Sequence, residues 1–169
     1  QMGIGRQQSR LFKGTSRDNM KWENPDLSDE DIITALKNAQ AYEFVSKLPM
    51  GLDSHVEQGG KNFSGGQRQR LCIARAIAAQ PKVLILDDSF SALDFATDAA
   101  LRKALSQYTH EMTVIIVTQR CSTIMNSDLI LVLDDGMLVG KGTHKELLKN
   151  CETYKEICLS QLSKSEVEV

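Results

Sequence analysis

The sequence has few aromatic residues, no strong charge of either sign and no long apolar run. Phe, Trp and Tyr make up 5% of the 169 residues, and the formal net charge is -2. A nucleic-acid-binding surface needs a basic face or stacking rings, so we expect no nucleic acid partner. The apolar runs at 114–117 and 129–133 are far too short to cross a bilayer, and no signal-peptide pattern is present. With 41% hydrophobic residues, the chain is long enough for one domain with a core.

Cysteine is present, but without the spacing of a metal or redox motif. No two of the four cysteines form a CxxC pair. A disulfide framework and a zinc site are the alternatives to free thiols, yet all four residues lie in segments with helical or helix-flanking character. We therefore expect reduced cysteines that act as small hydrophobes in a cytosolic environment. They are Cys72, Cys121, Cys151 and Cys158.

A pair of glycines stands directly before a helix-like run. Ser64, Gly65, Gly66 and Gln67 precede residues 71–78, which have helical character. The first amides of a helix lack internal acceptors, glycine lets an anion approach the backbone, and serine is a good N-cap. The same residues are also typical of an ordinary serine-capped helix. Taken alone, the motif leaves both a phosphate-binding helix start and a plain cap open.

The order of the predicted elements indicates a parallel sheet covered by helices. After residue 80 short apolar strands alternate with helices, as in parallel α/β folds. Strands are predicted at 82–86, 113–117 and 129–133, and helices at about 32–48, 64–78, 96–108, 122–125, 143–149 and 154–162. Residues 1–19 show neither helical periodicity nor strong strand alternation. Residues 134–136 predict a turn into an edge hairpin.

Two acids follow the first of these strands. Asp87 and Asp88 stand at its carboxyl end, the edge at which parallel sheets hold their ligands. Nucleotide-hydrolysing folds bind magnesium through an acid in this position. A solvated turn would have the same composition, and the acids alone leave that alternative open.

Four motifs, in this order, resemble the nucleotide-binding domain of an ATP-binding-cassette (ABC) transporter. They are Ser-Gly-Gly-Gln at 64–67, an apolar strand ending in two aspartates at 83–88, Ser-Ala-Leu-Asp at 91–94, and Thr-Gln-Arg at 118–120. The resemblance covers about residues 7–162. It implies an α/β fold: the carboxyl-terminal half of a P-loop NTPase (RecA-like) core, with an ABC helical subdomain and an incomplete sheet.

The resemblance divides the chain into four segments. Residues 1–19 correspond to a Q-loop segment and 20–80 to the ABC helical subdomain with its signature motif. Residues 81–150 correspond to half of the RecA-like core, with Walker B, the D-loop and the switch strand. Residues 151–169 would be a C-terminal helix and tail.

The resemblance also implies roles for individual residues toward ATP and Mg²⁺. Asp87 would be the Walker B ligand of magnesium, and Gln7, the Q-loop glutamine, would contact magnesium and the attacking water. Asp88 and Gln119 would stand at the positions of the catalytic base and the switch residue. The residues implied to contact ATP are Ser64, Gly65, Gly66 and Gln67 of the signature motif and Asp94 of the D-loop.

The phosphate-binding P-loop of the family, GxxxxGK[ST], is absent, as is the aromatic residue that stacks on adenine. Residues 136–143 look similar, but only three residues separate Gly136 from Gly140, where the P-loop has four, and the segment follows the last predicted strand. We interpret them as a hairpin. The chain therefore looks like a fragment. An exposed apolar face or unpaired sheet edge, and with it self-association, is expected.

Two further departures concern catalysis. Asp88 replaces the glutamate of the family and would draw its carboxylate back by about 1.5 Å, a carbon–carbon bond length. Gln119 replaces a histidine and cannot exchange a proton near neutral pH. The double change resembles the degenerate half of a heterodimeric multidrug exporter, whose signature motif serves the ATP site of its partner.

Three functions are compatible with the sequence. The first is part of an exporter ATPase on the cytoplasmic face of the cell membrane, with a second ABC half and a membrane domain as partners. There the Q-loop and the X-loop-like residues 56–60 would face the membrane domain. The second is a soluble ABC ATPase that acts on nucleic acid or ribosomes. The third is a non-catalytic interaction module, because ATPase activity is expected only in the full-length complex.

Overall fold

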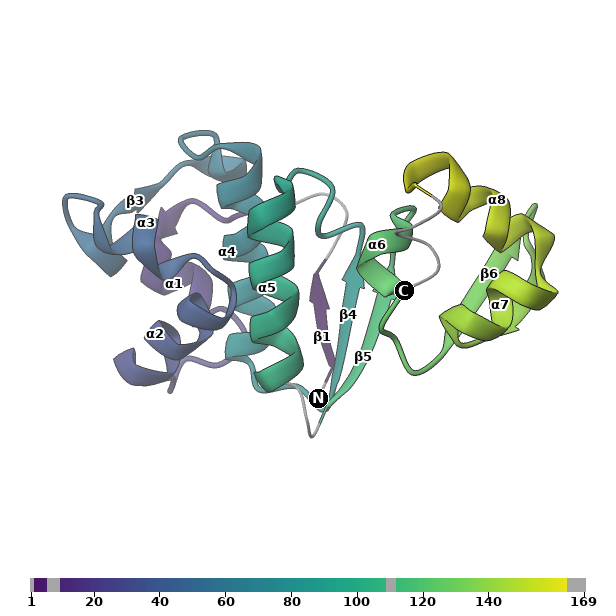
Figure 1. The fold of residues 1–169 in the computed structure, drawn as a ribbon. Coiled ribbons are helices and arrows are strands. Elements are labelled where there is room, and N and C mark those ends of the chain that lie inside the picture. The colour runs from purple at the N-terminus through teal and green to yellow at the C-terminus, as the bar shows by residue number, and fades with distance from the viewer. Residues whose placement is uncertain (1, 6–9, 109–111, 164–169) are drawn as a thin grey trace. The chain divides into compact units, whose positions relative to one another are not determined.

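The structure is a computed structural model that describes residues 2–5, 10–108 and 112–163 (Figure 1). It divides into two compact units, Gln1–Val117 and Thr118–Val169. The Q-loop candidate Gln7 lies outside the described residues.

A three-stranded parallel sheet forms the core of the first unit. Its order is β1 (Met2–Gly5), β4 (Val83–Asp87) and β5 (Thr113–Val117). The strands at 82–86 and 113–117 are confirmed to within one residue. The strand at β1 was not predicted, because Met-Gly-Ile-Gly carries no alternation of its own and gains its extended form by pairing along β4. The parallel arrangement brings Asp87 to the carboxyl edge of the sheet.

The described residues of the first unit form five α-helices (Figure 1). They are α1 (Ser16–Met20), α2 (Asp29–Asn38), α3 (Tyr42–Ser46), α4 (Gly65–Ala78) and α5 (Phe95–Tyr108). The single helix expected at 32–48 is wrong, because the chain turns at Gln40, whose φ of 55° lies in the left-handed region. Helix α1 was also missed, although Thr15 and Asp18 form a capping box at its start.

Short elements connect these helices. The two-residue strands β2 (Gly14–Thr15) and β3 (His55–Val56) pair antiparallel, and 3₁₀ turns cover Gly51–Asp53 and Gln58–Gly60.

The hydrophobic core gathers around α4. Ile73 and Ile77 of α4 are fully buried, as are Ile32 of α2 and Leu84 and Leu86 of β4. Helix α4 contacts β1, β4 and α2, so it lies between the sheet and the helical part. The first turn of α4, which carries the glycine motif, is thereby fixed by a packed helix.

The second unit is an antiparallel hairpin with three helices. Strands β6 (Ile130–Asp134) and β7 (Met137–Gly142) pair with each other, and the helices are α6 (Cys121–Ile124), α7 (His144–Asn150) and α8 (Glu152–Gln161). The strand at 129–133 is therefore confirmed, but it is not part of the parallel sheet. The hairpin at 136–143 is confirmed too: Asp135 and Gly136 have φ of 46° and 78°, as a tight turn of this kind requires.

A disulfide joins Cys121 of α6 to Cys158 of α8. The expectation that all four cysteines are reduced is wrong for this pair. The two residues are 37 positions apart, and only the packing of α8 beside α6 brings their Cα atoms to 5.5 Å. Cys72 and Cys151 are free and buried, as expected.

Apolar side chains are exposed on strand β5 of the parallel sheet and on strand β6 of the hairpin. Ile115 and Val117 of β5 are 45% and 51% exposed, and Leu131 and Leu133 of β6 are exposed as well. An exposed apolar face was expected, and the self-association inferred from it stays a prediction. Among the described residues, no helix has the length and apolarity needed to cross a membrane.

Substitutions at two neighbouring isoleucines of α2, Ile32 and Ile33, test the packing of α2 against α4. Replacing the fully buried Ile32 with alanine should lower the free energy of unfolding by about 2–5 kcal/mol, because it leaves a cavity beside α4. Ile33 is only partly buried, and Ile33→Ala should cost clearly less. Urea denaturation of both variants measures the difference, and equal losses would contradict the burial described for α2.

Candidate nucleotide-contacting site

The start of α4 is a capping box. Ser64 Oγ accepts the Gln67 backbone N–H at 3.2 Å, and Gln67 Oε1 accepts the Ser64 N–H at 3.0 Å. These bonds leave the N–H groups of Gly65 and Gly66 without an acceptor among the described residues. The predicted helix start is confirmed, and its two glycine amides are the donors available to an anion.

This box differs in charge from the others in the described chain. Its N3 residue is the neutral Gln67, and the first turn of α4 contains no acid. The Ser64 hydroxyl donates no hydrogen bond within the described residues, so its proton is available to a ligand. The other boxes pair a hydroxyl residue with an acid: Thr15 with Asp18, Ser28 with Asp31, and Thr143 with Glu146. A carboxylate at N3 would repel a phosphate, and α4 lacks it.

Gly66 lies close to the neighbouring loop. A Cβ atom on Gly66 would lie 3.1 Å from the backbone oxygen of Ala92, whereas one on Gly65 would meet the Ala92 Cβ at 3.5 Å, an ordinary contact. A side chain at position 66 would therefore push the backbone of the loop at 91–94 away from α4.

Gln69 holds the same loop by hydrogen bonds. Its Oε1 accepts the Ala92 N–H at 2.9 Å, and its Nε2 donates to Ser91 Oγ at 3.0 Å and to the Asp88 backbone oxygen at 3.4 Å. The Gln69 side chain is buried, whereas its partners Ser91 and Ala92 are exposed, so one side of each bond is shielded from water. Sequence reasoning missed it, although a glutamine four residues before the buried Ile73 is a polar residue on an apolar helix face.

Asp87 ends β4 and Asp88 follows it, and both carboxylates lack a protein partner within the described residues. Neither side chain accepts a hydrogen bond from, or forms an ion pair with, another described residue, and both are half-buried. A carboxylate without a protein partner at a strand end fits a hard cation such as Mg²⁺, and Asp87 is the residue that would hold it. Asp88 has a φ of 46°, and its N–H donates to the Val117 backbone oxygen at 2.8 Å.

Asp94 caps α5. Its carboxylate accepts the Thr97 N–H at 2.9 Å and the Thr97 hydroxyl at 2.7 Å. The backbone bond and then the hydroxyl bond lower the pKa of Asp94 below its usual value. The Asp94 carboxylate therefore fixes the end of the loop at 91–94, and its exposed position leaves it accessible to another molecule.

Gln119 belongs to the second unit. It lies exposed on the turn between β5 and α6, and its backbone oxygen accepts Gln161 Nε2 at 2.7 Å. Gln161 Oε1 accepts the Cys121 N–H at 3.0 Å, so α8 fixes both ends of this turn. The structure brings the motifs at 64–67, 87–88 and 91–94 together within the first unit.

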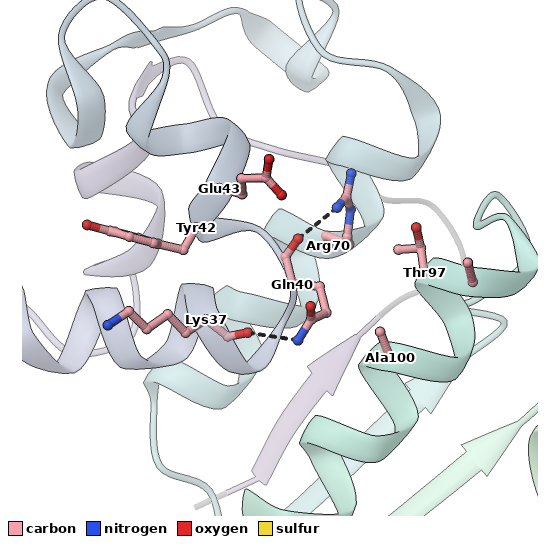
Figure 2. Close-up of a pocket in the computed structure, with 8 residues that line it drawn as sticks. Lys37, Gln40, Tyr42, Glu43, Arg70, Thr97 and Ala100 are labelled. Atoms are coloured by element: carbon pink, nitrogen blue, oxygen red, sulfur yellow. Dashed lines mark hydrogen bonds between the residues drawn. The ribbon is translucent and has the colours of Figure 1, made fainter.

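A cavity of about 470 Å³ lies beside the start of α4 (Figure 2). It is lined by Lys37, Gln40, Tyr42, Glu43, Arg70, Ala96, Thr97 and Ala100. Arg70 Nη1 donates to the Gln40 backbone oxygen at 2.7 Å, and the guanidinium lies 4.9 Å from the centre of the Phe44 ring. Burial lowers the pKa of Arg70, while Asp94 and Glu43 oppose this shift. None of the predicted site residues lines this cavity.

The X-loop-like residues lie at the surface of the helical part. Glu57 and Gln58 are exposed. Gly59 has a φ of 75° and donates its N–H to the Leu11 backbone oxygen at 2.9 Å. At Gly60, a Cβ atom would come within 2.9 Å of the Leu11 side chain, so the turn needs glycine there.

Comparison with known proteins identifies the family. A family model described as ABC transporter matches residues 1–91, which include α4, β4 and the acids Asp87 and Asp88. The chain belongs to the ABC transporter family. This membership supports the expected P-loop NTPase fold and does not favour the alternative of an ATPase acting on nucleic acid or ribosomes.

Two related proteins and one solved structure are similar to nearly the whole chain. An uncharacterized ABC transporter ATP-binding protein, YfiB, of Bacillus subtilis (strain 168) is 46% identical over 164 residues, 97% of this chain and 28% of that protein. An ATP-dependent lipid A-core flippase of Haemophilus influenzae (strain 86-028NP) is 44% identical over 158 residues, 93% of this chain and 27% of that protein. The structure of a bacterial Atm1-family ABC exporter with ATP bound has a TM-score of 0.90 and 35% identity, and the match covers 97% of this chain and 29% of that one. The chain thus spans less than a third of the length of each of these proteins.

Alanine substitutions at the two glycines test the close approach of the loop to α4. Gly66→Ala should destabilise the first unit relative to Gly65→Ala, because only the former places a methyl group against the Ala92 oxygen. Gly65→Ala should be neutral or slightly stabilising, since alanine is the better helix residue. Urea denaturation of the two variants gives the comparison, and a Gly66→Ala variant as stable as Gly65→Ala would rule out the contact.

Proposed function

We propose that this chain is part of the ATP-binding domain of an ABC exporter and supplies its signature motif to ATP held by a partner domain. The observation that carries the proposal is the neutral start of α4. There the Gly65 and Gly66 amides and the Ser64 hydroxyl are available donors, and no acid stands in the first turn. Donors fixed before a phosphate arrives stabilise developing charge without reorganisation.

The proposal assigns the residues after β4 and β5 to a second ATP site, distinct from the one that the start of α4 would contact. ATP and Mg²⁺ are the substrate and cofactor, and Asp87 would hold magnesium, whose positive charge neutralises the phosphates. Asp88 would serve poorly as a base, because its carboxylate is drawn back by one methylene, and a misplacement of about 1 Å can cost on the order of a hundredfold in rate. Gln119 would bind a γ-phosphate oxygen but could not exchange a proton. ATP hydrolysis at the site that contains Asp87, Asp88 and Gln119 would therefore be slow or absent.

Coupling to transport would pass through the surface of the helical part. The exposed Glu57 and Gln58 stand at the X-loop-like turn, whose backbone is fixed by Gly59 and Gly60. Exposed polar side chains on a rigid turn suit contact with a membrane domain. The working complex would comprise a second ABC half and a membrane domain, with this domain on the cytoplasmic face of the cell membrane. The name of one relative, a lipid A-core flippase, agrees with export as the process.

A single change of charge tests the proposal. In the full-length protein with its partner, Gln67→Glu should keep the capping box, because glutamate accepts the same N–H bond from Ser64. It should leave the free energy of unfolding unchanged or slightly higher, yet lower ATP hydrolysis at least about tenfold, because the carboxylate repels the phosphate.

Asp88→Asn in the same complex is the companion variant. It should leave most of the turnover in place, since the active site would use the base of the partner. Loss of turnover in Asp88→Asn would contradict the division of roles. Full turnover in Gln67→Glu would contradict the phosphate contact.

A further inference from the structure

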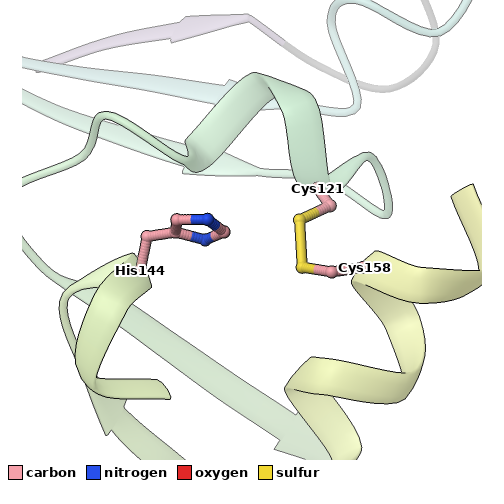
Figure 3. Close-up of side chains that lie close together, drawn as sticks. All are labelled: Cys121, His144 and Cys158. Carbon is pink, nitrogen blue, oxygen red and sulfur yellow. A yellow bond between two sulfur atoms is a disulfide. The ribbon is translucent and has the colours of Figure 1, made fainter. Parts of the chain in front are cut away.

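The second unit contains a compact group of two cysteines and a histidine (Figure 3). Cys121 begins α6, His144 begins α7 and Cys158 lies within α8. Their sulfur and ring nitrogen atoms all lie within 4.8 Å of one another, and the described residues contain no other such group. Three different helices thus converge on one point of the fold with ligand types that zinc prefers.

The group is enclosed by apolar residues. Cys121 and Cys158 are 1% and 0% exposed, and His144 is 5% exposed. The surrounding side chains include Ile130, Val132, Leu147 and Cys151. Charge in such a place is stable only if it is neutralised locally, and two thiolates with one divalent cation sum to zero.

Tyr154 orients the histidine of this group. Its hydroxyl lies 2.8 Å from His144 Nδ1 and 3.8 Å from Cys121 Sγ, and the two rings meet edge to face. A hydroxyl at one imidazole nitrogen fixes the ring in the manner of the outer-shell partners of zinc sites.

The distances suit an ion once the disulfide is reduced. With Zn–S bonds of about 2.3 Å and a Zn–N bond of about 2.0 Å, tetrahedral ligands stand about 3.5–3.8 Å apart. The two sulfurs must separate by somewhat under 2 Å from disulfide bonding distance, which rotation of the two side chains provides. A ring nitrogen of His144 already lies within 4.8 Å of the sulfurs of Cys121 and Cys158.

We propose that Cys121, His144 and Cys158 form a zinc site when the two cysteines are reduced. The fourth position would be taken by water, as in zinc sites with three protein ligands. The disulfide is the metal-free alternative of the same site, because its sulfurs no longer offer thiolates. A free disulfide such as glutathione disulfide converts one state into the other: the zinc dithiolate, one glutathione disulfide and two protons give the protein disulfide, two glutathione thiols and Zn²⁺.

Cobalt titration of the full chain tests the site. The chain is reduced with a phosphine, stripped with a chelator and titrated with Co²⁺, whose visible absorption is intense in tetrahedral sites with thiolate ligands. One equivalent should bind, and Zn²⁺ should displace it. The same chain oxidised by glutathione disulfide should show no such absorption, and oxidation of the zinc form should release one equivalent to a chromophoric zinc indicator.

Substitutions provide matched controls. Cys158→Ser should abolish the cobalt absorption, while Cys151→Ser, which removes a free cysteine of the same apolar cluster, should leave it intact. Tyr154→Phe should lower zinc affinity by about tenfold to a hundredfold. Absence of absorption in the reduced chain, or absorption that persists after oxidation, would overturn the proposal. The comparison of oxidised and reduced chain needs no variant, so a folding defect in Cys158→Ser, seen by circular dichroism, leaves that comparison decisive.

Discussion

The candidate nucleotide site depends on one contact, the attachment of the loop at 88–94 to the first turns of α4. Gln69 binds the loop through three hydrogen bonds, and the missing side chain of Gly66 lets the Ala92 oxygen approach. Helix α4 is itself the centre of the core. The first turns of α4 and the loop at 88–94 are therefore parts of one packed body.

Charge distinguishes the start of α4 from the other capped helices of the chain. A hydroxyl residue and an acid form the box at α1, α2 and α7, where the acid strengthens the cap. At α4 the acid is replaced by Gln67, which keeps the geometry but leaves the positive end of the helix dipole uncompensated. In the proposed function a phosphate held by a partner domain would compensate this charge. The Asp87 carboxylate, which has no partner among the described residues, would suit a cation.

Sequence reasoning succeeded where local signals decide the structure. The cap at Ser64, the apolar strand before Asp87 and the hairpin at 136–143 each follow from a few adjacent residues, and the structure contains all three. The motif order also led to the ABC transporter family. The roles assigned to Gln7 and Gln119 stay predictions, since Gln7 lies outside the described residues and Gln119 belongs to the second unit.

The errors arose where distant residues decide. Strand β1 exists because β4 pairs with it, and the predicted long helix is broken at Gln40, whose backbone oxygen accepts a bond from Arg70, thirty residues away. The Cys121–Cys158 disulfide needs the packing of α8 beside α6. Gln69 resembled any other helix residue until its partners in the loop at 88–94 were known. None of these contacts has a signature in neighbouring residues.

The most direct test of this account is amide hydrogen exchange at Ala92 in the chain with and without Gln69. Ala92 is exposed, so protection of its N–H depends on the bond to Gln69 Oε1. In Gln69→Leu, which keeps the buried volume, exchange at Ala92 should accelerate roughly tenfold or more, while the amides of α2 keep their protection. Unchanged exchange at Ala92 would contradict the claim that α4 holds the loop at 91–94.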